Sequence, residues 1–314
     1  MTIAVLRALG LGDLLTAFPA LRGIRRAFPH ARLVLATPAP LAPLAKLSGA
    51  VDEILDAAPL TPLAWRDERP HIAVNLHGRG PESHRVLLAL KPSRLIAFAH
   101  AAVAESAGGP VWRAEEHEVA RWCRLLREEG IDADPEDLDL DVPEGPVPSE
   151  AVGATIVHPG AAHPARRWPA HRWVAVATAE RHHGRAVIVT GGPNERDLAR
   201  AIADAAGLPP RAVLAGCTDV LGLARLVKVA GRVVCGDTGI AHLATAVRTP
   251  SVVLFGPTAP QRWGPPPSRP WHRVLWAGTS GAPNGTRVDP GLLRIRPDQV
   301  IAALAELPPL EAAA

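Results

Sequence analysis

A loop in the C-terminal half of the chain carries residues well suited to bind an anion. It contains Asp237, Thr238 and Gly239, which follow the apolar stretch 233–235 and precede a helical stretch at 240–247. The pattern indicates a buried strand, a tight glycine turn and a helix. The first N–H groups of a helix lack partners within the helix, and the helix dipole is positive there. The sequence therefore predicts a phosphate-binding turn at this position.

Two other side chains of this loop carry charge or can acquire it. Because an aspartate beside a phosphate repels it, we expect Asp237 to cap the helix or orient its neighbours, while Thr238 and the N–H groups hold a diphosphate. His242 lies one turn into the helix. It either stabilises a phosphate leaving group in its protonated form or serves as a structural hydrogen-bonding residue, and the sequence leaves both open.

A second candidate for chemistry is Asp13. It ends the turn Gly10-Leu11-Gly12-Asp13, between an apolar strand at 3–8 and a helical stretch at 14–27. Glycines let the backbone turn tightly and approach a ligand closely. The carboxylate either caps the helix or acts as a general base toward a hydroxyl group. The turn is no dinucleotide fingerprint, because Leu15 stands where the third glycine would be.

Four further loops follow predicted strands. Ligands of open parallel sheets bind outside the carboxyl ends of the strands, so these loops are candidate binding loops. The alternative for each is an ordinary turn or a solvated polar loop. Candidate residues are Arg166, Gly191, Gly192, Gly256, Pro257 and Thr258 in the C-terminal half, and His77 and Arg79, with His84 and Arg85 beyond them, in the N-terminal half. The cationic groups of the N-terminal loop suit a phosphorylated or carboxylated ligand.

The elements that must position these residues alternate between strand and helix along the whole chain. Such alternation predicts parallel α/β sheets. Residues 141–150, rich in proline, glutamate and glycine, form the best linker. We therefore expect two doubly wound Rossmann-like domains, 1–145 and 151–295, facing each other across a cleft.

Composition excludes several classes of protein. The chain is 47% hydrophobic and 21% charged with a net charge of +3, as in a globular protein. Its basic residues are dispersed without interleaved aromatic residues, so we expect no nucleic-acid partner. Three distant cysteines predict neither disulfides nor zinc. We interpret the acidic run 137–141 as solvent-facing rather than as a metal site.

Location follows from the apolar stretches. Arg7 and Asp13 interrupt the N-terminal one, which predicts no signal peptide. No window holds ~18 uncharged apolar residues, so we expect no transmembrane helix. A cytoplasmic protein is expected, and contact with the inner face of a membrane through basic patches stays open.

Residues 231–264 resemble the signature of glycosyltransferase family 9, the heptosyltransferases of the lipopolysaccharide core. The shared pattern is the Asp-Thr-Gly turn, a histidine three residues later, a run of small residues, and the Gly-Pro-Thr-x-Pro loop that begins at Gly256. The opening segment 6–29 is also similar to that family. The resemblance implies a GT-B fold, with a C-terminal helix, residues 296–314, packed on the N-terminal domain.

The resemblance also implies roles. The chain would be an inverting, metal-independent transferase that moves a heptose-like sugar from a nucleotide-diphosphate donor, ADP-linked by preference, to a glycan, lipid-linked or small-molecule acceptor, with no cofactor. Asp13 would be the base. The donor would contact Arg166, Gly191, Gly192, Asp237, Thr238, Gly239, His242, Gly256, Pro257 and Thr258, and the acceptor would contact Gly12, His77 and Arg79.

Some residues depart from the family pattern. Arg166 stands where the family has lysine, Ala161 and Ala162 replace hydroxyl-bearing residues, and Leu221 stands at the place of a ribose-binding glutamate, two residues after Asp219. These departures keep an alternative open: a nucleotide-sugar-binding protein without transfer activity. A nucleotide-sugar epimerase is a third hypothesis, which the 231–264 signature does not favour.

Overall fold

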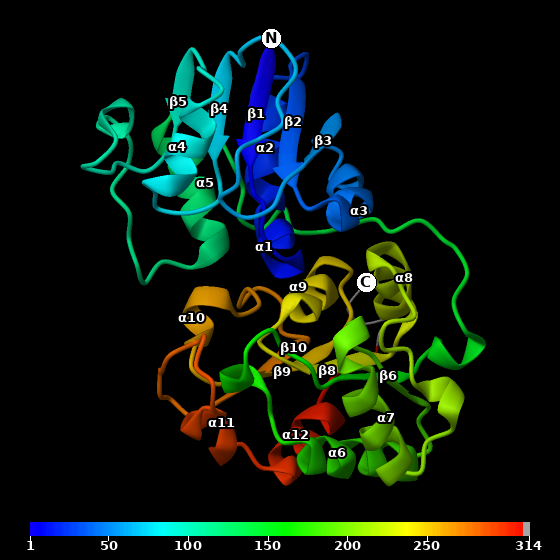
Figure 1. Cartoon of the computed structure of the whole chain (residues 1–314). Helices are drawn as coiled ribbons and strands as arrows, with labels where there is room; N and C mark the ends of the chain where they lie inside the picture. The colour runs from blue at the N-terminus through cyan, green and yellow to red at the C-terminus, as the bar shows by residue number, and fades with distance from the viewer. Residues whose placement is uncertain (310–314) are drawn as a thin grey trace. The chain divides into compact units, whose positions relative to one another are not determined.

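The computed structural model describes residues 1–309, which divide into two compact units. Unit 1 comprises Met1–Leu140, and unit 2 begins at Asp141. The division therefore falls at the first residue of the segment that composition marks as a linker. Each unit is a parallel sheet with helices on both faces (Figure 1).

The sheet of unit 1 has the strand order β3-β2-β1-β4-β5, and every pairing is parallel. Parallel sheets are covered on both faces, so their strands are apolar almost without interruption, as the central strand β1 shows. Its five strands are β1 (Thr2–Leu6), β2 (Arg32–Thr37), β3 (Glu53–Asp56), β4 (Ile72–Asn75) and β5 (Arg94–Ile96).

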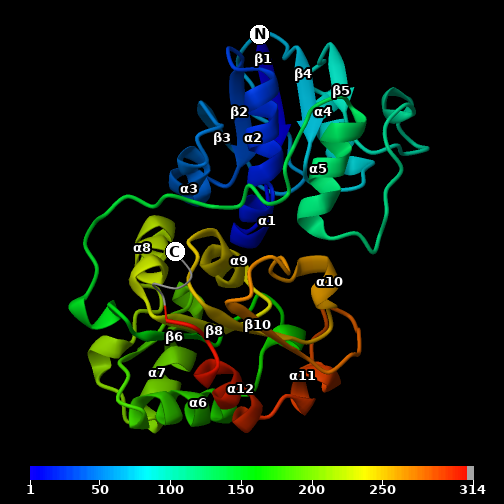
Figure 2. The ribbon, with the colours of Figure 1, turned by 180° about the vertical axis from the view of Figure 1, so that it is seen from behind.

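The helices of unit 1 are α1 (Leu11–Thr16), α2 (Phe18–Ala27), α3 (Ala42–Leu47), α4 (Glu82–Leu88) and α5 (Glu118–Glu128). The sequence predicted one helix over 14–27, but the structure divides it at Ala17, because Pro19 fits only the first turn of a new helix. Helices α2 and α5 pack together on one face of the sheet, and α4 covers the other (Figure 2).

The sheet of unit 2 has the order β10-β9-β8-β6-β7, again parallel throughout. Its strands are β6 (Thr155–His158), β7 (Val187–Val189), β8 (Arg232–Gly236), β9 (Ser251–Phe255) and β10 (His272–Trp276). The edge strand β10 was not predicted, because its apolar run, at 274–276, is short and follows the proline-rich stretch 265–270. Beside β7, Val213 forms one isolated bridge to Val189.

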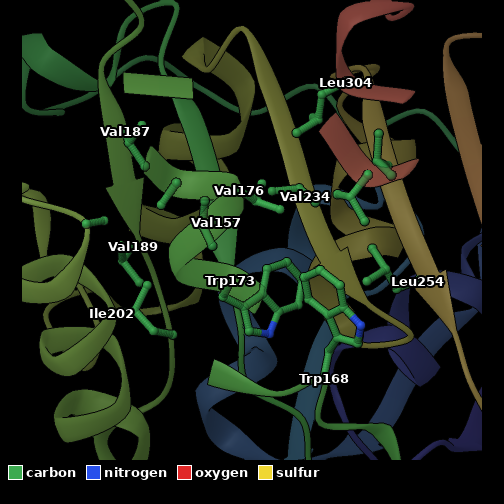
Figure 3. Packing of buried hydrophobic residues seen from close by; sticks show 14 of the residues in the cluster. Val157, Trp168, Trp173, Val176, Val187, Val189, Ile202, Val234, Leu254 and Leu304 are labelled. Carbon is green, nitrogen blue, oxygen red and sulfur yellow. The ribbon is translucent and has the colours of Figure 1, made fainter. Parts of the chain in front are cut away.

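The helices of unit 2 are α6 (Ala170–His182), α7 (Arg196–Ala205), α8 (Val220–Val229), α9 (Gly239–Ala246), α10 (Pro260–Trp263), α11 (Pro290–Arg294) and α12 (Pro297–Ala305). Helices α6, α7 and α12 cover one face of the sheet, where Trp168 and Trp173 pack against Val157, Val234 and Leu254 (Figure 3). Helices α8 and α9 lie on the other face.

The C-terminal helix corrects one expectation. We expected residues 296–314 to pack on the N-terminal domain, but α12 packs on α6 and β9 of its own unit. Its side chains Val300 and Leu304 are fully buried in the core of unit 2. Burial of two large apolar side chains explains why the helix stays there. Residues 310–314 of the expected segment lie outside the described part of the chain.

Each sheet contains one point where successive strands turn from building one side to building the other. In unit 1 this switch point lies between β1 and β4, and in unit 2 it lies between β6 and β8. The loops after the two central strands diverge there and leave a crevice, which is where doubly wound sheets bind ligands. The topology therefore selects the loops after these four strands as candidate sites.

Candidate functional site

Asp13 lies at the switch point of unit 1, in the first turn of α1. Its Oδ2 accepts a hydrogen bond from the Gly10 N–H at 3.2 Å, so it does satisfy a free donor at the start of the helix. Its Oδ1 lies 3.3 Å from Nη2 of Arg7, and 29% of the side chain remains exposed. The carboxylate is thus held by two donors and still reachable by a ligand.

Arg7, just beyond the end of β1, is the buried centre of this region. Its guanidinium donates to the Leu76 carbonyl at 2.5 Å and to Thr16 Oγ1 at 3.1 Å, and it is fully buried. It also pairs with Glu118 of α5 at 3.0 Å. Sequence reasoning missed Arg7 and Glu118 as site residues; the available signal was a single arginine at the end of an apolar strand, which needs a buried partner.

Burial raises the pKa of the Asp13 carboxyl above its ordinary value. The Arg7 guanidinium lowers that pKa and the Glu118 carboxylate raises it, and the net result is upward. A carboxylate with a raised pKa binds a proton more strongly, which makes it a better general base at neutral pH.

The loop after β4 supplies the other side of this switch point. Asn75 shapes the loop: its amide donates to the Gly78 carbonyl at 3.0 Å, and its Oδ1 accepts from the His77 N–H at 2.9 Å. Burial, and secondly the charge of Arg7, lowers the pKa of His77 to about 4. The imidazole is therefore neutral at physiological pH and lies near Arg7.

The remaining residues predicted for the N-terminal site separate in the structure. Gly12 lies on α1 beside Asp13, and Arg79 is exposed on the β4 loop. His84, by contrast, is fully buried, and its ring packs so closely on Gly80 that a Cβ there would lie 2.0 Å from it. His84 is therefore a residue of the interior and cannot contact a ligand as the sequence suggested.

At the switch point of unit 2, the loops after β6 and β8 meet through Arg166 and Asp237. Arg166 ends a short 3₁₀ turn, Pro164–Arg166. Its Nη1 donates to the Asp237 carbonyl at 3.2 Å and lies 4.0 Å from Asp237 Oδ2. A guanidinium thus stands next to the turn that was predicted to bind phosphate.

The turn itself has the expected strand–turn–helix form. Thr238, not Asp237, is the N-cap of α9, and its backbone is extended. Asp237 is buried, and its Oδ2 lies 4.0 Å from Arg166 Nη1, which agrees with the second of its expected roles, that of orienting its neighbours. Thr238 and Gly239 remain half-buried at the helix N-terminus, where free N–H groups favour an anion.

His242 occupies the first full turn of α9 and is half-buried. Its ring stands edge-on to Trp263 of α10, with the ring centroids 5.7 Å apart. The packing fixes the orientation of the imidazole on the same end of the sheet as Thr238 and Gly239.

The loop after β9 is buried rather than open. Gly256, Pro257 and Thr258 are all buried, and the Pro257 carbonyl accepts from the Gly281 N–H at 2.9 Å. A Cβ on Gly256 would lie 3.0 Å from Leu292. These residues hold the neighbouring loops in place, and this is the structural role that the sequence left as an alternative.

The loop after β7 contains a residue that sequence reasoning missed. The Gly192 N–H donates to Glu195 Oε2 at 2.8 Å, while the Gly191 carbonyl accepts from Gly216. A Cβ on Gly160 would lie 2.0 Å from the Glu195 carboxylate, so Glu195 joins the loops after β6 and β7. The spacing from Gly192 to Glu195, typical of a capping box, was the available signal.

Two departures from the family pattern acquire a structural meaning. Asp219 caps α8: its Oδ1 accepts from the Gly222 N–H at 2.6 Å. One oxygen of its carboxylate, Oδ1, is thereby committed to the helix cap. The Ala161 carbonyl accepts from Arg167 Nε at 2.8 Å, which fixes the loop after β6 without a hydroxyl side chain.

Two further properties concern residues 1–309, the part of the chain that the structure describes. Within this range no helix has the length and apolar character needed to cross a bilayer. Nor do three or more His, Cys, Asp or Glu side chains of the same range gather in a group suited to a metal ion.

Solved structures show the same fold. Escherichia coli ADP-heptose lipopolysaccharide heptosyltransferase II matches with a TM-score of 0.78 and 23% identity, over 97% of this chain and 98% of that one. A family 9 glycosyltransferase from Veillonella parvula gives 0.78 and 20%, over 97% and 96%. The Escherichia coli heptosyltransferase WaaC, solved with ADP, gives 0.71 and 17%, over 98% and 99%. The chain therefore has the GT-B type of fold, two doubly wound domains.

A curated relative is closer in sequence over a shorter stretch. Lipopolysaccharide heptosyltransferase 3 of Escherichia coli is 37% identical over 109 residues, which are 33% of this chain and 31% of that protein. The chain thus matches about a third of the length of this relative.

The family itself is settled by a longer match. A sequence model of glycosyltransferase family 9 (heptosyltransferase) matches residues 102–290, more than half of the chain. The range includes the Arg166 loop, the Asp237 turn and the loops that support them. The chain therefore belongs to glycosyltransferase family 9, the heptosyltransferase family.

Proposed function

We propose that this protein is an inverting, metal-independent glycosyltransferase that moves a heptose-like sugar from an ADP-linked donor to an acceptor hydroxyl. The observation that carries the proposal is the carboxylate of Asp13. It lies at a switch point, 29% exposed, held by the Gly10 N–H and Arg7, with a pKa raised by burial. A base of this kind takes the proton from the acceptor hydroxyl as that oxygen attacks the sugar on the face opposite the leaving diphosphate.

Unit 2 supplies what the leaving group needs. As the glycosidic bond breaks, negative charge grows on the diphosphate. Arg166, the Thr238 hydroxyl and the N–H groups at the start of α9 are placed to stabilise that charge without a metal ion. ADP is the proposed nucleotide because two matched structures, heptosyltransferase II and WaaC, carry ADP-heptose or ADP in their names.

In this proposal residues 1–145 form the acceptor domain and residues 151–295 the donor domain. Gly12, His77 and Arg79 would contact the acceptor, a glycan, lipid-linked or small molecule. Donor contacts would come from the Arg166 loop, Asp237, His242 and the glycine loop at 191–192, while the buried residues 256–258 would support these loops from the interior. We further propose a cytoplasmic location, with peripheral contact to the inner face of the membrane.

Calorimetry with ADP, UDP, GDP and dTDP, each with and without Mg²⁺, tests the donor assignment. We expect ADP to bind most tightly and Mg²⁺ to change its affinity little. Preference for another nucleotide contradicts the ADP assignment. Strong dependence on Mg²⁺ contradicts a metal-independent site.

Transfer is tested next with ADP-heptose and a panel of acceptors. The alternative function, a binding protein without transfer activity, predicts tight ADP-heptose binding with neither transfer nor hydrolysis. One observation favours this alternative: Asp219 caps α8, so the ribose of the donor has one fewer carboxylate to bind.

A further inference from the structure

Glu118 is a buried carboxylate that the proposed reaction does not yet use. It begins α5, 5% of the residue is exposed, and it lies more than a hundred residues from Asp13 in the sequence. Its Oε1 accepts from the Trp122 indole N–H at 2.9 Å and from Arg7 at 3.0 Å. Its Oε2 pairs with Arg121. Such complete satisfaction is what a buried carboxylate requires to stay ionised.

Arg7 is shared between two carboxylates through one nitrogen. Its Nη2 lies 3.0 Å from Glu118 and 3.3 Å from Asp13. The guanidinium also stacks over Trp122, with its carbon 5.0 Å from the ring centroid. Because Glu118 is the nearer and more buried partner, its Coulombic attraction to Arg7 is the stronger of the two.

We propose that Glu118 is a positioning residue for Asp13, acting through Arg7: it balances the charge of Arg7, so that this guanidinium orients the Asp13 carboxylate without weakening it as a base. Without Glu118, Asp13 would be the only carboxylate within residues 1–309 that pairs with Arg7. Its proton affinity would then fall, as a carboxylate beside an uncompensated cation does. This inference rests on the proposed role of Asp13.

The charged and titratable groups around Asp13 come from four elements. Arg7 follows β1, Glu118 and Arg121 are on α5, His77 follows β4, and the Gly10 N–H opens α1. Burial keeps His77 neutral above about pH 4, so it adds no charge at neutral pH.

The pKa directions agree with this arrangement. Burial raises the pKa of Glu118, but the guanidiniums of Arg7 and Arg121 outweigh it and leave that pKa below its ordinary value. Burial raises the pKa of Asp13, and Glu118 offsets part of the lowering by Arg7. The buried carboxylate of Glu118 is therefore the permanent anion, and the partly exposed carboxylate of Asp13 is free to take a proton.

NMR of protein labelled with ¹³C at aspartate carboxyls tests the inference without any substrate. The Asp13 resonance is identified by its loss in Asp13→Asn, and its titration midpoint is measured. We expect Glu118→Gln to move that midpoint to lower pH. Glu118→Asp, which keeps the charge, should leave it near the wild-type value. Trp122→Phe, which removes a neutral donor and alters the packing beside Arg7 but keeps every charge, should do the same.

A second variant guards against a folding defect. Glu118→Gln leaves Arg121 without its carboxylate, so Glu118→Gln/Arg121→Met removes both partners, and the Asp13 midpoint should again lie below the wild-type value. An unchanged midpoint in both folded variants overturns the inference. So does a Trp122→Phe shift as large as that of Glu118→Gln, because that result assigns the effect to packing.

The same variants act on the reaction once an acceptor is known. Glu118→Gln should move the acidic limb of the rate profile to lower pH and reduce kcat by about tenfold, since a weaker base abstracts the proton less readily. If Asp13→Asn transfers normally, the proposed function of Asp13 fails, whatever the NMR shows. If Asp13→Asn is inactive while Glu118→Gln leaves the midpoint and the acidic limb unmoved, only the role of Glu118 fails.

Discussion

The switch points of the two units are built by the same topology but carry different groups. In unit 1 the switch point between β1 and β4 carries charged side chains, with Arg7, Asp13 and Glu118 linked by ion pairs. In unit 2 the switch point between β6 and β8 carries the N-terminus of α9 and the guanidinium of Arg166. The first set can exchange a proton; the second offers fixed positive charge.

This difference indicates a division of work between the units. A proton acceptor must change its charge during the reaction, so it needs a tuned side chain and buried partners to tune it. A diphosphate site needs donors that keep their charge and position, which helix N–H groups and arginine supply. Changes in unit 1 should therefore affect the rate, and changes in unit 2 should affect donor affinity.

The strongest test removes the proton acceptor. We expect Asp13→Asn to reduce kcat by ~10²- to 10⁴-fold, the range for loss of a general base, because the amide cannot take the proton. ADP affinity, measured by calorimetry, should stay within about twofold of wild type. Normal transfer in this variant would contradict the assignment of Asp13 as the base. A large loss of ADP affinity would contradict the division of roles between the two units.

The second test concerns the helix that was expected on the other domain. Leu304→Ala should lower the free energy of unfolding of unit 2 by about 3 kcal/mol, since a fully buried leucine leaves a cavity. Unfolding in urea, monitored through the loss of ADP binding, measures this free energy. Leu293→Ala, at a side chain that is 40% exposed, is the matched control and should change stability by less than about 0.5 kcal/mol. Equal effects would contradict the packing of α12 in unit 2.

The third test weakens the fixed charge of unit 2. Arg166→Met should raise the Kd for ADP by ~10- to 100-fold, the value of one or two charge-assisted hydrogen bonds. The titration midpoint of Asp13 should not move. Arg211→Ala, at an exposed arginine paired with Glu150, controls for a general change in charge. Unchanged ADP affinity in Arg166→Met would show that the helix N-terminus binds the diphosphate alone.

The smallest effect expected is a pH dependence that originates in the interior of unit 1. Burial, and then the nearby His100, lowers the pKa of His84 to about 4, against 6.5 in the unfolded chain. Between these two pH values the unfolded chain therefore binds more protons at His84 than the folded chain does. The free energy of unfolding is thus highest above pH 6.5 and declines as the pH falls toward 4.

The contribution of His84 to this decline is about 1 kcal/mol between pH 7.5 and 5.5. His84→Leu removes the titrating group, and the free energy of unfolding, followed by urea at both pH values, should then decline less on acidification. In unit 2 burial lowers the pKa of His272 to about 3, so its pH dependence has the same sign and should be unaffected by His84→Leu. An identical pH dependence in wild type and variant would contradict the burial of an unprotonated His84.

Local signals in the sequence predicted much of the fold. The apolar runs of β1, β8 and β9, the glycine turns after them and the linker at 141–150 all depend on neighbouring residues, and such signals can be read directly. The edge strand β10 was missed because its apolar run of three residues is short and follows a proline-rich stretch, which is typical of a loop. The helix predicted over 14–27 is divided in the structure because of Pro19, a local signal that the sequence itself contains.

The sequence by itself determined which residues are candidates for chemistry: the Asp13 turn, the Arg166 loop and the Asp237 turn, because residue type and local spacing specify them. Only the tertiary structure decided which partners they have. Arg7 and Glu118 are 111 residues apart, and their pairing depends on α5 returning to the end of β1. The burial of His84, the place of α12 and the raised pKa of Asp13 have the same origin. Desolvation and pairing are properties of the packed interior, and no short stretch of sequence contains them.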